Sequence, residues 1–315
     1  MKKALITGIS GFAGSHLAEL LVSRNIKVTG FLHPGHPATN VDFLKEKLSL
    51  QKCDILQKKE VQKLLKQSDF DYVFHLAAFS SPLESFIDPE KTVKNNVIGE
   101  LNLLESLSNL KSKAKILIVG SAEEYGSPKT KSVNENTLLS PESPYAVSKV
   151  AQDLLGYQFF LHENLQIIRV RPFNHIGPRQ SKSFVVSAYA SQIAKLEKKG
   201  SGQMKVGNLN SWRDFTDVRD MVKAYLLALE IGISGEVYNL GSAKAYKIED
   251  ILNTLLSFTK AKIEIITDKS LIRKGDNKKI VCDYSKFKKQ TGWQPRIPIF
   301  KTLFDTIEYE RQILN

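Results

Sequence analysis

The sequence predicts an α/β fold, in which a doubly wound parallel sheet is joined to a smaller C-terminal α/β lobe. Three observations predict it: short apolar runs alternate with amphipathic runs up to residue 171, the first apolar run leads directly into a glycine-rich turn, and the rhythm loosens after Pro172. Strands that alternate with helices favour right-handed crossovers and a parallel sheet. A chain of 315 residues is long enough for two lobes. We assign residues 1–171 to the first lobe, expect 215–241 to return to it, and assign 172–315 to a second lobe.

Hydrophobic periodicity predicts the individual elements. Ile116–Val119 is apolar throughout, which is typical of a strand buried on both faces, whereas Thr92–Leu107 repeats apolar residues at helical spacing. The predicted strands are Ala4–Thr7, Lys27–Leu32, Leu48–Cys53, Tyr72–Ala77, Ile116–Val119, Gln166–Arg171, Trp212–Asp217 and Glu236–Leu240. The predicted helices are Ala13–Arg24, Val61–Gln67, Thr92–Leu107, Pro144–His162, Val185–Lys199, Val218–Ile231, Ile248–Phe258 and Ile299–Ile313.

Composition excludes several classes of protein. No apolar run is long enough to span a bilayer, and two cysteines cannot form a disulfide framework. The net charge of +12 fits nucleic acid, an anionic membrane or a polyanionic small substrate. The densest basic stretch, residues 269–289, has little aromatic interleaving, which argues against a platform for single-stranded nucleic acid. We expect a cytoplasmic protein without a membrane or nucleic-acid partner.

A G-x-x-G-x-x-G motif lies between the first predicted strand and the first predicted helix. Glycine permits the tight turn and the close approach of the backbone to a pyrophosphate, and the helix start offers N–H groups and a positive dipole end. The sequence therefore predicts a Rossmann dinucleotide-binding loop. Its expected cofactor contacts are Gly8, Ser10, Gly11, Phe12, Ala13 and Gly14.

The residues at the end of the second predicted strand indicate which of the two nicotinamide dinucleotides is preferred. NAD-specific folds usually carry an acid there that binds the ribose 2′-hydroxyl, but no acid stands between Gly30 and Asn40. We therefore expect NADP(H) to be preferred, with NAD(H) as the alternative, and His33 to contact the 2′-phosphate. His33 and His36 make a poor metal pair because no third ligand is evident, so no metal is expected.

A Tyr-x-x-x-Lys pair puts both side chains on one helix face, where a lysine ammonium lowers the pKa of the phenol. Of the three such pairs in the chain, Tyr145/Lys149 alone lies on a predicted helix of the first lobe, with Pro144 at its start and Ser143 or Ser140 as its cap. Ser121 follows the strand Ile116–Val119, at the sheet edge where ligands bind. We expect Tyr145 and Lys149 to carry proton transfer, with Ser121 polarising the same oxygen.

These motifs resemble the extended short-chain dehydrogenase/reductase family over essentially the whole chain. The matching strings are TGISGFAG, Cys53-Asp54-Ile55, His75-Leu76-Ala77-Ala78, Asn95-Asn96-Val97, Ser121, and Tyr145 with Lys149. The resemblance implies that Asp54 and Ile55 border the adenine and that Asn96 supports the active site. It also implies that Leu76, Ala77, Ala78, Pro172, Tyr145 and Lys149 contact the cofactor.

The second half resembles the GDP-4-keto-6-deoxy-D-mannose reductases within that family, with the GDP-mannose 4,6-dehydratases as relatives. The strings are RPFNHIGP from Arg171, VGNL from Val206 and RDFTDVRD from Arg213. The resemblance implies a substrate site formed by Ser80, Asn174, Val185, Arg213, Arg273 and Asp276, in which the two arginines clamp the diphosphate. Glu123 stands where the dehydratases keep a glutamate base. Two departures are Arg179, where glycine is usual, and Lys274, where proline is usual.

The resemblance implies reduction of the 4-keto group of GDP-4-keto-6-deoxy-D-mannose by NAD(P)H, giving GDP-D-rhamnose. One alternative is a GDP-mannose 4,6-dehydratase or another nucleotide-sugar dehydratase or epimerase. A second alternative is a non-catalytic protein that binds a dinucleotide or RNA. The resemblance also implies a homodimer through helices 92–107 and 144–162, where Leu103, Leu155 and Phe159 are apolar residues beyond one face.

Overall fold

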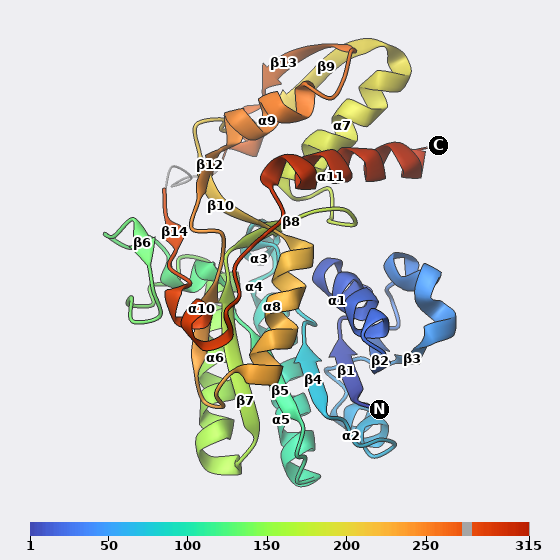
Figure 1. The fold of residues 1–315 in the computed structure, drawn as a ribbon, viewed down its shortest axis with the longest axis vertical. Helices are drawn as coiled ribbons and strands as arrows, with labels where there is room; N and C mark the ends of the chain where they lie inside the picture. Colours follow the sequence, from blue (N-terminus) through green and yellow to red (C-terminus); the bar gives the residue numbers. More distant parts are fainter. Residues whose placement is uncertain (273–278, 315) are drawn as a thin grey trace.

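The structure, a computed structural model, describes residues 1–272 and 279–314, and a parallel sheet forms the centre of its larger lobe (Figure 1). Within the described residues this sheet has seven strands, all parallel. The chain adds strands outward from β1, first toward one edge of the sheet and then toward the other. Across the sheet the strands are β3 (Leu48–Lys52), β2 (Lys27–Leu32), β1 (Lys3–Thr7), β4 (Tyr72–His75), β5 (Lys115–Val119), β7 (Gln166–Pro172) and β11 (Val237–Leu240). The predicted doubly wound fold is confirmed.

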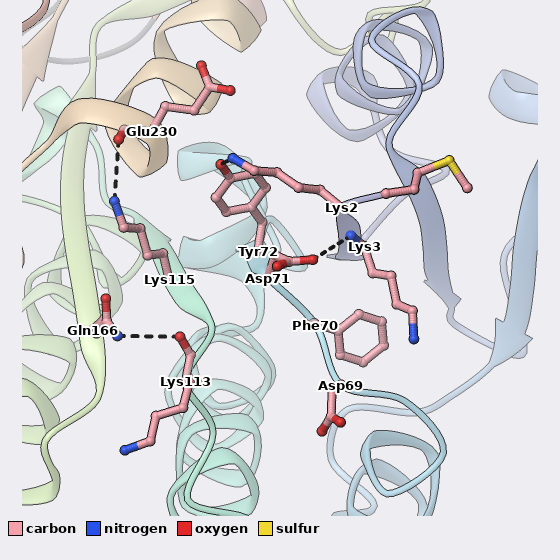
Figure 2. A pocket seen from close by; sticks show the side chains of 11 residues that line it. Lys2, Lys3, Asp69, Phe70, Asp71, Tyr72, Lys113, Lys115, Gln166 and Glu230 are labelled. Carbon is pink, nitrogen blue, oxygen red and sulfur yellow. Dashed lines mark hydrogen bonds between the residues drawn. The ribbon is translucent and has the colours of Figure 1, made fainter.

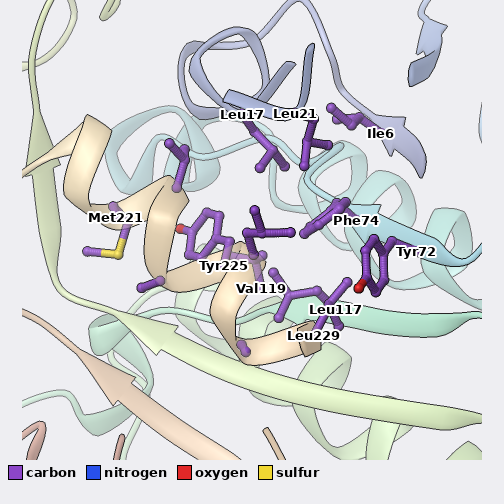
Figure 3. Close-up of a cluster of buried hydrophobic side chains, with 14 of the residues drawn as sticks. Ile6, Leu17, Leu21, Tyr72, Phe74, Leu117, Val119, Met221, Tyr225 and Leu229 are labelled. Atoms are coloured by element: carbon purple, nitrogen blue, oxygen red, sulfur yellow. The ribbon is translucent and has the colours of Figure 1, made fainter. Parts of the chain in front are cut away.

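Helices cover both faces of this sheet because successive side chains of each strand point to opposite faces. In β1, Ile6 packs with α1 and α8, whereas its neighbour Leu5 packs with α2 and α5. Figure 3 shows the first of these clusters, in which side chains of α1 and α8 meet those of β1, β4 and β5. The covering helices are α1 (Phe12–Ser23) and α8 (Val218–Ile231) on one face, and α2 (Lys58–Leu65), α5 (Gly99–Asn109) and α6 (Pro144–Glu163) on the other.

A second core lies in the upper part of Figure 1, apart from the large sheet. Its helices enclose apolar residues such as Ile193, Leu252 and Leu303. The helices are α7 (Val185–Lys199), α9 (Ile248–Leu256) and α11 (Ile299–Leu314), and they pack with the parallel pair β9 (Ser201–Val206) and β13 (Lys262–Thr267). Between the two cores lies a small sheet of β8 (Asn174–Ile176), β10 (Trp212–Asp217) and β12 (Ala245–Lys247).

The chain crosses between the lobes more than once. After β10, helix α8 packs on the large sheet and β11 pairs in parallel with β7. Helix α10 (Ser285–Thr291) returns as well, because Phe287 and Trp293 belong to the cluster of α1 and α8. We propose two lobes divided near residue 172, with the expected segment 215–241 counted with the first, and 285–293 as well.

Local signals explain several boundaries. Ser143 caps α6 by accepting the N–H of Ala146 (3.1 Å), and Pro144 occupies its first turn. The predicted helix over 92–107 is interrupted: α4 (Pro89–Val93) continues through a wider π turn, Lys94–Ile98, into α5. Among the described residues, no helix is long and apolar enough to cross a membrane.

Hydrophobic periodicity did not predict several of the shorter elements. Most of them pair or pack with segments far away in the sequence, so no local pattern marks them. They are the helix α3 (Pro82–Ile87), the 3₁₀ turns Thr39–Lys47, Ala122–Tyr125 and Lys269–Leu271, and the strand pair β6 (Ser132–Val133) and β14 (Val281–Cys282), in addition to α4, α10, β8, β9, β12 and β13.

Candidate active site

The glycine-rich loop closes tightly against the sheet at the carboxyl end of β1. Gly8 has a φ of +72°, and a Cβ at Gly8 would lie 2.8 Å from the backbone nitrogen of Ala77. A Cβ at Gly14 would lie 2.3 Å from the Gly8 carbonyl oxygen, whereas Gly11 is exposed. Gly8 and Gly14 are therefore needed for packing, and Gly11 leaves the start of α1 open.

The start of α1 fits an anionic group. Its N-cap, Gly11, offers no side-chain acceptor to the first helical N–H groups, and its first turn holds no acidic residue. Backbone N–H groups at such a helix end attract phosphate. Ser10 and Ala13 flank this opening, and the carbonyl of Ser10 accepts a bond from the Asn40 amide (3.0 Å). The loop thus presents the surroundings that a dinucleotide pyrophosphate requires.

The loop after β2 carries no carboxylate near its start, as the sequence indicates. His33 is exposed, and its Nδ1 accepts the N–H of Gly35 (3.1 Å). The rings of His33 and His36 lie 4.9 Å apart. Across the described residues, no group of three or more His, Cys, Asp or Glu side chains is placed to hold a metal ion.

Ser121, Tyr145 and Lys149 meet at the carboxyl end of β5. The Tyr145 hydroxyl is hydrogen-bonded to Ser121, and the Lys149 ammonium lies 6.0 Å from the Tyr145 ring centre. Lys149 Nζ donates to the carbonyl of Val119 (2.8 Å), and all three side chains are less than a tenth exposed. The structure therefore brings together the three residues that the sequence selected.

The protonation of this set is controlled by burial. Burial raises the pKa of Tyr145, and the hydrogen bond with Ser121 offsets part of that increase. The predicted net lowering of the Tyr145 pKa is wrong, because loss of hydration outweighs the other effects at this phenol. Burial also lowers the pKa of Lys149 to about 8, although Glu100 and Glu124 attract its charge. Tyr145 is thus a protonated phenol at neutral pH, which suits a proton donor.

The expected cofactor residues line the same edge of the sheet. Leu76, Ala77 and Ala78 follow β4, and the N–H of Ala77 donates to Thr7 Oγ1 (3.2 Å). Asp54 follows β3 and accepts the N–H of Leu56 (3.0 Å). Ile55 is buried against Gly99: a Cβ on Gly99 would lie 2.7 Å from Cγ2 of Ile55. Pro172 is the last residue of β7.

Asn96 has a supporting position. Its amide is fully buried in the π turn and links two segments: it donates to the Phe79 carbonyl (3.1 Å) and to Ser148 Oγ (2.9 Å), and it accepts the Phe79 N–H (2.8 Å). These bonds hold the loop after β4 against α6. Asn96 therefore acts through its neighbours rather than through an exposed amide.

The glutamate that contacts Ser121 is Glu124, which the sequence did not select. Glu124 is buried and its Oε1 accepts the N–H of Ser121 (2.7 Å), whereas Glu123 is exposed. The charge of Glu123 still acts on Tyr145, so it lies near the site. Gly120 makes the Glu124 bond feasible, because a Cβ there would lie 2.2 Å from Oε1. The capping pattern of Ser121 followed three residues later by Glu124 was the available signal.

The predicted substrate residues come from both lobes. Asn174 begins β8 and pairs with Phe215 of β10, so it lies one strand away from Arg213 of the same sheet. Arg213 is half-buried and donates to the Trp212 carbonyl (2.7 Å). Val185 starts α7, and Ser80 is exposed in the loop after β4. Arg273 and Asp276 lie outside the described residues.

Arg179 links the two lobes, and its position explains one departure from the reductase pattern. Its φ is +72°, a left-handed conformation that favours glycine. Its guanidinium donates to Nδ1 of His16 (2.6 Å), pairs with Glu19 (2.7 Å) and lies over the ring of Phe43 (5.2 Å). Burial, together with the Arg179 charge, lowers the pKa of His16 to about 3. These contacts stabilise an arginine at a position where glycine is usual.

Phe12 of the glycine-rich loop also reaches the lobe junction. Its ring stacks on His175 of β8 with 5.6 Å between ring centres and 7° between ring planes. The loop that is open to a dinucleotide and the strand that carries Asn174 are therefore in direct contact.

A cavity of about 570 Å³ lies at the opposite, amino-terminal edge of the large sheet. Figure 2 shows its lining, which includes Lys2, Asp71, Tyr72, Lys115 and Glu230. The Lys115 ammonium donates to the Glu230 carbonyl (3.3 Å) across it. None of the residues selected for chemistry lines this cavity. The candidate active site is therefore the polar carboxyl-terminal edge.

With the geometry established, comparison with known proteins decides the family. The family model of GDP-mannose 4,6 dehydratase matches residues 5–306. This chain belongs to that family. The assignment confirms the resemblance to the extended short-chain dehydrogenases/reductases, whose members carry nucleotide-sugar dehydratase, reductase and epimerase activities.

Individual members of the GDP-mannose 4,6 dehydratase family and its neighbours are similar over nearly full length. The GDP-6-deoxy-D-mannose reductase of Pseudomonas aeruginosa is 31% identical, over 96% of this chain and 95% of its own. A solved structure of RMD from Pseudomonas aeruginosa complexed with NADPH matches with a TM-score of 0.87 and 30% identity, covering 99% of this chain and 100% of that one. The UDP-glucose 4-epimerase of Thermotoga maritima with UDP-glucose matches with a TM-score of 0.91 and 27% identity, covering 99% and 100%.

Proposed function

We propose that this chain reduces the 4-keto group of GDP-4-keto-6-deoxy-D-mannose with NADPH, giving GDP-D-rhamnose. One observation carries the proposal: Tyr145, Ser121 and Lys149 meet at the ligand-binding edge of a Rossmann sheet. The chain in which they meet is 31% identical to a GDP-6-deoxy-D-mannose reductase.

Each residue of the set has a distinct task. When bound, the nicotinamide cofactor supplies a hydride. Tyr145 donates its phenolic proton to O4 of the sugar, and Ser121 donates a hydrogen bond that polarises the ketone. Lys149 stabilises the phenolate that remains and is expected to bind the nicotinamide ribose. Glu124 orients Ser121 through the bond to its N–H (2.7 Å).

The open start of α1 supports a dinucleotide, whose pyrophosphate the N–H groups beside Gly11 would hold. The absence of a carboxylate from Gly30 to Asn40 supports NADPH over NADH, with His33 beside the 2′-phosphate. NAD(H) remains the alternative cofactor. A tenfold or greater preference for NADH in kcat/KM would contradict this assignment.

The second lobe is proposed to bind the GDP moiety. Asn174 and Arg213 lie on neighbouring strands at the lobe junction, where a guanidinium can bind a diphosphate through charge-assisted hydrogen bonds. Ser80 and Val185 complete the described part of the proposed substrate site. Arg273 and Asp276 stay predictions, as do a cytoplasmic location and the lack of a nucleic-acid partner.

A homodimer is proposed through α4–α5 and α6. On α6, Val147, Leu154 and Leu161 are exposed by 48%, 54% and 53%, and they recur every seven residues. Val93 and Ile98 are exposed on the neighbouring helix segment. Such an apolar stripe supports helix packing against a second copy. The residues named from the sequence were wrong, since Leu103 and Phe159 are buried in the core beneath the sheet and Leu155 packs against it.

The test is incubation with GDP-4-keto-6-deoxy-D-mannose and NADPH. We expect one equivalent of NADPH absorbance to be lost per product, and NMR of the product to give its C4 configuration. A second candidate is a GDP-mannose 4,6-dehydratase, which the charge of Glu123 near Tyr145 favours. That enzyme would convert GDP-mannose without net loss of reduced cofactor. Turnover of GDP-mannose alone would therefore overturn the reductase proposal.

A further inference from the structure

The loop that follows β8 joins the proposed second lobe to two segments of the first. It carries Arg179, whose side chain is only 10% exposed. The guanidinium contacts α1 and also the 3₁₀ turn Thr39–Lys47, which follows β2. The start of α1 and the end of β2 are where Rossmann folds bind the pyrophosphate and the adenosine ribose of a dinucleotide. The contacting residues are His16 and Glu19 of α1, and Asn40 and Phe43 of the turn.

The contacts with α1 tie the loop after β8 to this helix. Nη2 of Arg179 donates to Nδ1 of His16 (2.6 Å) and pairs with Glu19 Oε2 at 2.7 Å. Because an arginine only donates, His16 Nδ1 is the acceptor, which leaves Nε2 to donate to the Pro178 carbonyl (2.9 Å). Both ring nitrogens of the buried His16 are therefore used, and residues 178 and 179 are both held against α1.

The contacts with the turn continue to the glycine-rich loop. Nη1 of Arg179 donates to the backbone carbonyl of Asn40 (3.4 Å), and the guanidinium lies 5.2 Å from the ring centre of Phe43. The side-chain amide of Asn40 donates in turn to the carbonyl of Ser10 (3.0 Å). Apolar residues attach the turn to the core, so these polar bonds fix its first residues relative to the glycine-rich loop. A chain of contacts thus runs from Arg179 through Asn40 to Ser10.

The backbone at position 179 does not itself require an arginine. Its φ of +72° is a left-handed conformation that is unfavourable for a residue with a Cβ. Glycine, which is usual at this position in the reductases that the sequence resembles, adopts the conformation freely. What Arg179 contributes therefore comes from its side-chain contacts with α1 and the turn, and a glycine in its place removes those contacts without straining the loop.

We propose that Arg179 is a positioning residue of the cofactor site, although it lies in the lobe proposed for the substrate. It holds the turn after β2 against α1 and the glycine-rich loop, in the arrangement that binds the adenosine half of the dinucleotide. Arg179 acts through these neighbours, because its guanidinium is committed to Glu19, His16 and the Asn40 carbonyl. The inference rests on the dinucleotide site of the proposed function, but not on the sugar substrate or the catalytic residues.

The first test compares Arg179→Gly with the wild type in binding and in stability. Binding is measured by fluorescence titration with NADPH and by calorimetry with 2′,5′-ADP, which is adenosine with its 2′- and 5′-phosphates. Both affinities should fall about five- to tenfold, the value of a hydrogen-bonded link, while GDP affinity stays constant. The denaturation midpoint without ligand should change little, because relief of the left-handed backbone offsets the lost contacts.

The matched control is Lys111→Gly. Lys111 is another left-handed residue (φ +51°), and it is exposed in the turn before β5, so its substitution should leave both affinities unchanged. Unchanged binding of NADPH and 2′,5′-ADP by Arg179→Gly, with only a lower midpoint, would overturn the proposal in favour of a purely structural role. Weaker GDP binding with unchanged NADPH binding would overturn it in favour of the substrate site. A wild type that binds dinucleotides but reduces no nucleotide-sugar would contradict the proposed function alone.

The second test cuts the same chain of contacts at its other end. Asn40→Ala removes the bond to Ser10 and keeps the backbone carbonyl that Arg179 contacts, so NADPH should weaken by a similar factor. In the double variant the loss should be smaller than the product of the two factors, because both residues act through one link. Independent losses that multiply would refute the link. If Arg179→Gly fails to fold, Arg179→Lys replaces it, since one ammonium cannot bond α1 and the turn together, and the same loss of affinity is expected.

Discussion

The two faces of α6 differ from those of an ordinary surface helix, which buries its apolar stripe and exposes its polar one. The inward face of α6 carries apolar Phe159 near the C-terminal end and, before it, a set of buried polar groups: Tyr145, Ser148, Lys149, Gln152 and Asp153. The outward face carries exposed apolar groups: Val147, Leu154 and Leu161.

The inward and outward faces of α6 are suited to two different tasks. Buried polar side chains are held by partners from other elements, as Asp153 is held by two arginines of β7. The inward face is therefore rigid and suited to chemistry within one chain. The outward face holds none of the proposed catalytic residues, and its exposed apolar groups form the surface proposed to meet a second copy. Substitutions on the two faces should consequently have separate effects.

Tyr145→Phe should cause the largest effect, because it removes the proposed proton donor and little volume. We expect kcat to fall by about 10²- to 10⁴-fold, which is the usual contribution of a general acid. Dinucleotide affinity, measured by fluorescence titration, should be retained. Tyr157→Phe, on the same helix but exposed by 39%, is the control and should keep its activity. A Tyr145→Phe enzyme with more than half the normal kcat would show that another group is the acid.

Asp153→Asn should have the largest effect on stability. The substitution leaves Arg169 and Arg171 with an uncompensated buried charge, and breaking such a pair lowers the free energy of unfolding by about 3–5 kcal/mol. Urea denaturation would measure it. The control, Glu163→Gln at the exposed end of α6, should change the free energy of unfolding by less than about 0.5 kcal/mol. Equal changes in the two variants would contradict the contrast between buried and exposed charges.

The fold could be predicted from the sequence because strands and helices of the large sheet carry strong local periodicity. The bounds of β2, β10, α7 and α8 agree with prediction to the residue. β9 and β13 were missed, because each gains its partner from a segment about 60 residues away rather than from its own pattern.

The site could be predicted in part. The Tyr145/Lys149 spacing and the glycine pattern are local, so they were found. Polar residues at helical spacing after Tyr145, namely Gln152 and Asp153, were a readable signal of a buried polar face that went unused. Their partners Glu100 and Arg171 could not be identified, because the sequence does not say which distant charges a buried helix face meets.

Arg213→Ala tests whether the affinity for the substrate depends on residues of the second lobe rather than on α6. A charge-assisted bond to an ionised group contributes roughly 1.5–3 kcal/mol, so KM for the nucleotide-sugar should rise about ten- to a hundredfold. The change in kcat should be smaller, and GDP should weaken as a competitive inhibitor to a similar degree. NADPH affinity should stay constant, because the expected phosphate loop, Gly8–Gly14, lies in the other lobe. Weaker NADPH binding with unchanged GDP inhibition would refute the proposed role of the second lobe.

Leu154→Lys should have the smallest effect on catalysis while changing the assembly. Leu154 lies in the middle of the outward stripe, and a lysine there would place a charge in an apolar helix interface, where its loss of hydration is unfavourable. Sedimentation at micromolar concentration should change from dimer to monomer, with kcat altered by less than about twofold because the inward face is intact. Leu138→Lys is the matched control, since Leu138 is 83% exposed in a loop away from the helix pair, and it should stay dimeric. A Leu154→Lys protein that remains a dimer would show that the copies meet through another surface. A monomer that has also lost kcat would show that the two faces of α6 are coupled through the helix rather than independent.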